Sequence, residues 1–183
     1  MAVRRKRSLY TLSELDLAYI SGIWAGDGNI FAQIIPREDY VLKFQIYLSV
    51  NLTQKTQRKH ILLQLQKILG VGIVRDRGDG ISDLTLNGFD LVGPFLTQLV
   101  PYMRLKQRQA NLALKIIEQH SLARRNPIQF LELCVLADQV AAANDSKNRM
   151  HTSQSVLKRF KSLYPEIQFP ELDSTQAVRS PVA

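Results

Sequence analysis

The sequence of 183 residues is 45% hydrophobic, which suits one domain with its own core. Its single cysteine, Cys134, excludes an internal disulfide and a zinc site of several cysteines. No apolar run approaches the ~20 residues of a membrane-spanning helix, so no membrane partner is expected. Lys and Arg total 24 against 16 acidic residues; the net charge of +8 favours a polyanionic partner.

Composition divides the chain into three parts. Residues 1–13 form a basic arm without the apolar stretch of a secretory signal, so they are not expected to be one. Residues 14–164 alternate between helical and strand patterns without a linker and are expected to form a single domain. Residues 165–183 contain several prolines and little periodicity, which predicts a loosely held tail.

The first helix is predicted over residues 14–25, with Thr11 or Ser13 as its N-cap. Positions 18, 22 and 25 share a face by helical spacing, and all three carry small residues. A glycine inside a helix costs ~1 kcal/mol relative to alanine, a cost that is tolerated where another backbone comes close. We therefore expect a short-range contact with a second helix, made by Ala18, Ser21, Gly22 and Ala25.

A turn is predicted directly after this helix, and it holds one carboxylate between two glycines: Gly26, Asp27 and Gly28. Taken alone, the pattern is typical of an ordinary turn. Only the neighbouring sequence can assign a function to this Gly-Asp-Gly pattern.

Two strands follow, over residues 29–36 and 43–52. The second alternates polar and apolar residues five times, from Lys43 and Phe44 to Asn51 and Leu52, as a half-exposed strand does. Its polar face offers amides, hydroxyls, an ammonium and a tyrosine, which are groups able to bond base edges. The alternative to a nucleic-acid-binding face is an ordinary solvent-exposed face of a strand.

A second helix–strand–strand unit is predicted next. Residues 53–70 read as an amphipathic helix with a basic start and Gly70 as its C-cap. A hairpin over 72–86 turns at Gly78–Gly80. Arg75 and Arg77 share one face of its first arm.

Four helices complete the chain. Two of them are separated at Pro101, the second beginning near Lys106; a third covers 127–143 and a short one 153–164. The resulting order, α-β-β-α-β-β-α-α-α-α, predicts an α+β fold with a four-stranded antiparallel sheet. Helices would cover one face and polar side chains would occupy the other.

The stretch "ISGIWAGDG" resembles the motif of the LAGLIDADG homing endonucleases. The segments "TQKTQRK", "GVGIVRDRG", "FLTQL", "LKQRQANLALKIIEQ" and "NDSK" resemble the single-motif, intron-encoded branch, in order, from about residue 14 to 160. Such a resemblance implies a saddle with four strands per subunit in the DNA major groove. It also implies a homodimer on a long, nearly palindromic double-stranded DNA site.

The implied activity is a staggered double-strand break that promotes mobility of the host intron. The two motif helices would pack at the dyad and bring two Asp27 carboxylates together, where they repel. Mg²⁺ would relieve this repulsion, with Mn²⁺ as a substitute and Ca²⁺ supporting only binding. No small-molecule cofactor is expected. The resemblance favours a chloroplast or mitochondrion, with a prokaryotic cytoplasm as the alternative.

The resemblance also assigns individual residues. Asp27 and Gly26 match the metal-binding pair, and Asp27, Gln54, Arg58 and Lys106 match the catalytic set. The residues matched to DNA contacts are Phe31, Gln33, Arg37, Tyr40, Gln45, Tyr47, Asn51, Arg75, Arg77, Asp83 and Thr85, with Ser146 and Lys147 matched to phosphate contacts.

The chain departs from the family pattern at Ala25, where the motif has its first acidic residue. It also departs in the segment "SLARRNP" (residues 121–127) and at Met150 and His151, where a pattern of basic and threonine side chains is expected, so weaker contacts with the DNA backbone are expected there. Two other functions fit the same fold: an RNA maturase that assists splicing, and a DNA-binding regulator that does not cleave.

Overall fold

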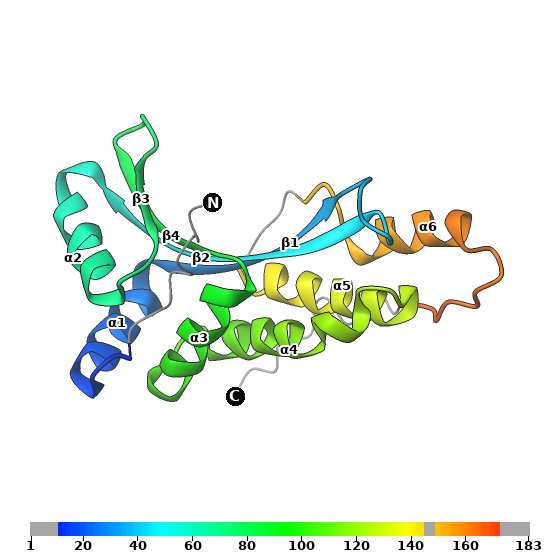
Figure 1. Cartoon of the computed structure of the whole chain (residues 1–183). Coiled ribbons are helices and arrows are strands. Elements are labelled where there is room, and N and C mark those ends of the chain that lie inside the picture. Colours follow the sequence, from blue (N-terminus) through cyan, green and yellow to red (C-terminus); the bar gives the residue numbers. More distant parts are fainter. Residues whose placement is uncertain (1–10, 145–148, 173–183) are drawn as a thin grey trace, which may run out of the picture. The chain divides into compact units, whose positions relative to one another are not determined.

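The structure, a computed structural model, describes residues 11–144 and 149–172. Its helices and strands are drawn in Figure 1. In chain order they are α1 (Glu14–Asp27), β1 (Gly28–Pro36), β2 (Phe44–Lys55), α2 (Lys59–Leu69), β3 (Ile73–Asp76), β4 (Ile81–Asn87), α3 (Phe89–Leu99), α4 (Gln107–Ala123), α5 (Pro127–Ala142) and α6 (Ser153–Leu163), with 3-10 turns η1 (Thr56–Arg58) and η2 (Val100–Tyr102).

One four-stranded sheet has the order β1-β2-β4-β3. Strand β4 is antiparallel to both of its neighbours: Asn51 of β2 is opposite Thr85, and Arg75 of β3 is opposite Asp83. Burial alternates along the strands: in β4, Leu84 and Leu86 are buried, while Asp83, Thr85 and Asn87 are partly exposed. The α+β class and the half-polar sheet are confirmed.

The described residues form two compact units. The first contains α1, the second half of β2, and the chain from there to the start of α4. The second contains most of β1, the first part of β2, and the chain from residue 111. Strands β1 and β2 therefore each have residues in both units. The expected boundaries at residues 13 and 164 stay a prediction.

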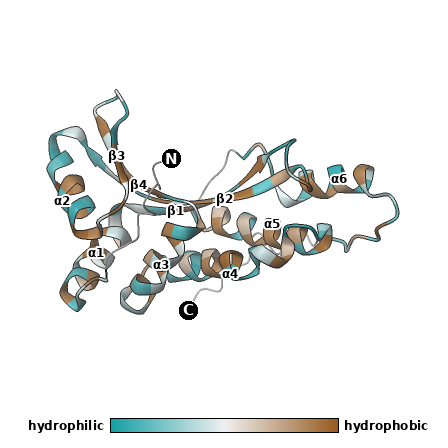
Figure 2. Ribbon diagram, viewed as in Figure 1, coloured by the Kyte–Doolittle hydropathy of each residue, from teal (hydrophilic) through white to brown (hydrophobic). Residues whose placement is uncertain are grey.

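Each unit has its own apolar core. In the first, Trp24 of α1 meets Phe95 of α3 edge to face, with ring centroids 4.8 Å apart. In the second, Phe160 of α6 packs against Phe44 and Phe130. Helix α2 carries hydrophobic and hydrophilic residues in turn (Figure 2), and its leucines 62, 65 and 69 are buried, as its sequence pattern predicts.

Two predicted boundaries are wrong, both at positions that matter for the site. Helix α1 continues two residues further than expected and ends on Asp27, so this residue lies in helix and β1 follows without a loop. The helix expected from residue 53 begins only at Lys59, because β2 stays paired with β4 as far as Lys55 opposite Ile81. Gln54 therefore lies on a strand.

Candidate active site

The C-terminus of α1 is held by a tight contact with its own previous turn. The backbone N–H of Gly28 donates to the carbonyl of Trp24, closing the helix. A Cβ at position 28 would lie 2.1 Å from Cδ1 of Trp24, whose side chain is fully buried. Glycine is required here by space alone, since its φ of −84° suits any residue. The Trp24 ring therefore packs directly against the backbone of Gly28 and fixes the point at which α1 ends. In this way it also fixes the position of Asp27, the last residue of the helix.

Gln54 reaches Asp27 from β2. Its amide Nε2 donates to Oδ2 of Asp27 over 2.5 Å, and its backbone is fixed opposite Ser82 of β4. Asp27 itself is exposed. A carboxylate that is oriented from one side and open on the other can accept a ligand.

Lys106 closes the other side of the helix end. Its Nζ donates to the carbonyls of Trp24, Gly26 and Gly28 at 3.2, 3.3 and 2.5 Å. The carbonyls at the end of a helix carry partial negative charge, and most of them lack a partner within the helix, so an ammonium stabilises them. Burial lowers the pKa of Lys106 from its usual value, and the charge of Asp27 opposes that shift.

Lys106 occupies an unusual backbone conformation. Its φ is +63°, in the left-handed region, directly before α4 begins. Its carbonyl accepts from the N–H of Ala110 at 3.0 Å and so starts the helix. This conformation turns the chain sharply, and a lysine rather than a glycine at the turn puts an ammonium on the end of α1.

The structure thus brings together three of the four predicted catalytic residues: Asp27, Gln54 and Lys106. It does not join Arg58 to them. Arg58 ends the turn η1 and is exposed, and no hydrogen bond or ion pair within the described residues connects it with this cluster. The sequence did not indicate the role of the Trp24 carbonyl and ring, because a buried tryptophan in an apolar helix carries no site signal.

The small-residue face of α1 is largely open within this chain. Ala18 and Gly22 are exposed and Ala25 is partly exposed, whereas Ser21 is buried at 3% exposure. Ser21 therefore lies on the inner side of the helix, and the predicted contact with a second helix, Ser21 included, stays a prediction. A Cβ on Gly22 would meet nothing within 4 Å. Nothing in the described part of the chain explains a glycine there.

The donors for a metal ion are few in one chain. The cluster offers the carboxylate of Asp27 and the carbonyl of Gly26, both hard oxygen ligands of the kind Mg²⁺ takes. The described residues contain no group of three or more His, Cys, Asp or Glu side chains that could hold a metal. The chemistry of the donors fits Mg²⁺, but a full set needs oxygens from outside this chain.

The DNA-contact residues predicted in the first unit lie on the outward face of the sheet around β4. Asp83 accepts from the Thr53 hydroxyl at 2.6 Å, and its other oxygen lies 3.7 Å from Arg77. Arg77 also lies 3.7 Å from Asp79 and follows the end of β3. Arg75 is on the strand and exposed, and no ion pair to it occurs within the described ranges.

The remaining predicted contacts lie in the second unit. Phe31 and Gln33 of β1 and Gln45 and Tyr47 of β2 alternate with buried neighbours and so face outward. Arg37 donates twice to Asp39, at 3.1 Å each, which lowers the pKa of that carboxyl. The Arg37 guanidinium also lies 5.1 Å from the ring centroid of Tyr40.

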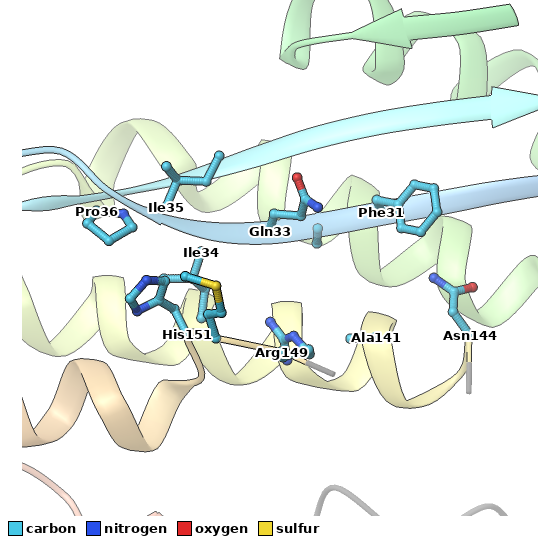
Figure 3. A pocket seen from close by; sticks show the side chains of 11 residues that line it. Phe31, Gln33, Ile34, Ile35, Pro36, Ala141, Asn144, Arg149 and His151 are labelled. Carbon is cyan, nitrogen blue, oxygen red and sulfur yellow. The ribbon is translucent and has the colours of Figure 1, made fainter. Parts of the chain in front are cut away.

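A cavity of about 440 Å³ lies beside β1 (Figure 3). Figure 3 shows Gln33 and Ile35 on one side of the strand and Ile34, Arg149 and His151 on the other. Arg149 forms an ion pair with Asp138 of α5, and Asp138 also accepts from the N–H of Ser153 at the start of α6. Ser146 and Lys147, predicted to touch phosphates, fall outside the described residues.

No helix in the described ranges has the length and apolar character needed to cross a membrane.

Comparison with known proteins identifies the fold and the family. A family model described as LAGLIDADG endonuclease matches residues 20–116. DNA endonuclease I-CreI of Chlamydomonas reinhardtii is 50% identical over 147 residues, covering 80% of this chain and 90% of that protein. DNA endonuclease I-CvuI of Chlorella vulgaris is 40% identical over 150 residues, covering 82% of this chain and 92% of that protein. The crystal structure of I-CvuI in complex with the I-CreI target matches with a TM-score of 0.77 at 39% identity, over 82% of this chain and 95% of that one. This chain belongs to the LAGLIDADG endonuclease family.

Proposed function

We propose that this protein is a homing endonuclease that makes a staggered double-strand break in a long, nearly palindromic DNA site and so promotes mobility of its host intron. The observation that carries the proposal is the cluster at the end of α1. Asp27 is oriented by Gln54 and left exposed, and Lys106 holds the surrounding carbonyls. The names of the two relatives, both DNA endonucleases, support the same activity.

Mg²⁺ fits this cluster, with Asp27 and the Gly26 carbonyl as its ligands from each chain. When bound, it would activate water and stabilise the leaving oxygen of the scissile phosphate. Gln54 fixes the rotamer of the Asp27 carboxylate by its hydrogen bond. Lys106 neutralises the negative end of α1, and it would place a positive charge close to the scissile phosphate of bound DNA. Mn²⁺ would substitute for Mg²⁺, and Ca²⁺ would support binding alone.

The protein would act as a homodimer whose α1 helices pack together. Two observations support this arrangement. Gly22 has no neighbour within 4 Å that requires a glycine, although glycine costs a helix ~1 kcal/mol. Beside it, Leu15 and Tyr19 are large apolar side chains with 84% and 47% exposure. A second copy would cover this face and supply the second carboxylate that the metal site lacks.

Cleavage of plasmids tests the chemistry. Substrates carry the I-CreI target or the target crystallised with I-CvuI, because these relatives are similar along most of the chain. We expect linear product with Mg²⁺ from the wild type, and none from Asp27→Asn, which should still bind the same duplex. Efficient cleavage by Asp27→Asn would remove this residue from the mechanism. Specific DNA binding without cleavage, whichever divalent metal is added, would point to a DNA-binding regulator. Assistance of intron splicing, with neither specific DNA binding nor cleavage, would point to a maturase.

Sedimentation tests the dimer. Gly22→Leu should separate the two α1 helices and give a monomer at micromolar concentration, whereas Leu63→Ala, at an exposed position of α2, should stay dimeric. An unchanged dimer in Gly22→Leu would place the interface elsewhere.

An organelle location is a separate proposal, for which the algal sources of both relatives are the support. Sequencing of the DNA on both sides of the coding region would test it.

A further inference from the structure

One serine lies on the buried face of the sheet, where its neighbours along the strand are apolar. Ser82 of β4 has 0% exposure, and Leu84 and Leu86 follow it on the same face. A hydroxyl that is removed from water costs free energy unless it forms hydrogen bonds. An apolar side chain at position 82 would fill the core of the first unit equally well, so packing alone does not explain the serine.

Ser82 is the centre of a polar row that crosses three strands. The register places Gln54 of β2 opposite Ser82, and Ser82 opposite Asp76 of β3. Residues directly opposite each other in antiparallel strands share a face, with Cβ atoms about 4.5–5.5 Å apart. Gln54 is also the residue that donates to Asp27 at 2.5 Å. Ser82 is therefore the cross-strand neighbour of the residue that orients the proposed metal ligand.

The Ser82 hydroxyl joins this row to the turn that follows β2. Its Oγ lies 2.8 Å from Oδ1 of Asp76 and 3.0 Å from Oγ1 of Thr56, the first residue of η1. An ionised carboxylate only accepts hydrogen bonds, so Ser82 donates its single proton to Asp76 and accepts the proton of Thr56. Lys59, at the start of α2, donates to the other oxygen of Asp76 at 2.8 Å. Side chains on both sides of η1 are thus bonded to the β3–β4 hairpin.

Thr56 connects this hydrogen-bonded row to the active site, because it is only two residues from Gln54. Its backbone N–H donates to the carbonyl of Gly80, in the turn between β3 and β4, at 2.8 Å. With both its backbone and its side chain bonded to the hairpin, Thr56 fixes the direction in which the chain leaves β2. A strand end without such contacts opens locally, and the Gln54 amide would then adopt several orientations.

We propose that Ser82 is a positioning residue for cleavage: it holds Thr56 and so keeps the Gln54 amide on Asp27. Ser82 is fully buried, so it acts on the reaction without touching DNA. Its effect reaches Asp27 only through Gln54. A small displacement of a group that positions the reacting atoms slows the chemical step and leaves substrate binding largely intact. The inference rests on the proposed function, since it needs a cleavage reaction.

Single-turnover cleavage at saturating protein, well below the melting temperature of every variant, tests the inference. Ser82→Ala should cleave roughly tenfold more slowly than the wild type and bind the target with the same affinity. Thr56→Val has a similar shape without the hydroxyl and should be slowed to the same extent, whereas Thr56→Ser keeps the hydroxyl and should cleave at the wild-type rate. Ser82→Ala/Thr56→Val should be no slower than either single variant, because both changes remove the same hydrogen bond.

A Gln54→Ala background tests the route of the effect. Adding Ser82→Ala to it should not slow cleavage further, because the connection to Asp27 is already lost. Ser153→Ala is the matched control and should cleave at the wild-type rate. It removes a serine hydroxyl of similarly low exposure, 6%, from the second unit, and its backbone N–H keeps the bond to Asp138.

Three results would overturn the inference. Wild-type rates in both Ser82→Ala and Thr56→Val would make the row purely structural, whatever happens to the melting temperatures. Equal slowing of Thr56→Ser and Thr56→Val would assign the effect to packing rather than to the hydroxyl. Further slowing by Ser82→Ala in the Gln54→Ala background would show a route that bypasses Gln54.

Two further outcomes are distinguished by the same experiment. If Ser82→Ala does not fold, the two Thr56 variants decide the question, in the wild-type and the Gln54→Ala backgrounds. Cleavage by the wild type together with any of the three contrary results removes this inference alone. Absence of cleavage by the wild type removes the proposed function and this inference with it.

Discussion

The end of α1 and the β3–β4 hairpin belong to the same compact unit, yet they hold their charged groups in opposite ways. At the helix end, Lys106 bonds three carbonyls and Gln54 fixes Asp27 at 2.5 Å. In the hairpin, Arg77 lies 3.7 Å from each of two carboxylates and is half-exposed, and Arg75 is exposed on the strand.

The difference follows from what each region is proposed to do. Cleavage needs groups at set positions before the substrate arrives, because reorganisation during the reaction would raise its barrier. Base recognition needs long side chains that can exchange protein or water partners for base edges, since the preferred contact depends on DNA shape. Backbone carbonyls hold the first region, and weak exposed ion pairs leave the second adaptable.

The largest effect should come from Gly28→Ala. The new Cβ would lie 2.1 Å from the buried Trp24 ring, which Phe95 blocks from moving away. We expect a loss of about 3 kcal/mol in the free energy of unfolding, and loss of cleavage as Asp27 moves. Urea unfolding measures the stability. Lys67→Ala, at an exposed position of α2, is the control; if Gly28→Ala loses no more stability than this variant, the ring does not set the helix end.

Lys106→Met should have the next largest effect. It removes the ammonium from the three carbonyls, at a cost of about 1–2 kcal/mol in stability. Cleavage should fall by roughly 10- to 100-fold, as for loss of one group that stabilises charge in the reaction. Single-turnover kinetics at saturating protein separate this loss from weaker DNA binding. Lys67→Met, at an exposed position of α2, should leave both quantities unchanged.

The two hairpin arginines should differ in specificity. Arg75→Ala should relax preference at one base pair in each half-site by about 1–2 kcal/mol, if it makes a bidentate contact to guanine. Arg77→Ala should change less, because Arg77 must first leave Asp79 and Asp83. A cleavage profile over single-base variants of the site measures both. A uniform drop across all variants for Arg75→Ala would make it a backbone contact instead.

The smallest effect should come from the exposed ion pair of Lys59 and Asp76, 2.8 Å apart. Lys59, with Ser82, lowers the pKa of Asp76 from its usual value of 3.8. The ionised carboxylate therefore stabilises the folded state at a pH above the usual pKa. This contribution is lost as the pH falls through the lower pKa that Asp76 has in the folded state. Lys59→Gln should melt slightly below the wild type at neutral pH, and the difference should vanish in acid. A difference that persists in acid would assign the effect to packing.

The sequence alone determined most of the fold. Alternation in residues 43–52 predicted a strand with one polar face, and β2 has that face. Gly70 ends α2 with a φ of +69°, as a glycine at a helix C-cap should. These features depend on neighbours within a few residues, so the local pattern suffices. The resemblance of short segments to one family added the identity of Asp27, Gln54 and Lys106.

Only the tertiary structure decided how these residues meet. Gln54 reads as part of a helix, yet pairing with β4 keeps it in a strand and directs its amide to Asp27. Ser21 reads as part of a small-residue face, yet the core of the unit buries it. Lys106 lies about 80 residues from the carbonyls that it holds. Partners so distant in sequence leave no periodic pattern, because their contact depends on how the intervening strands and helices pack.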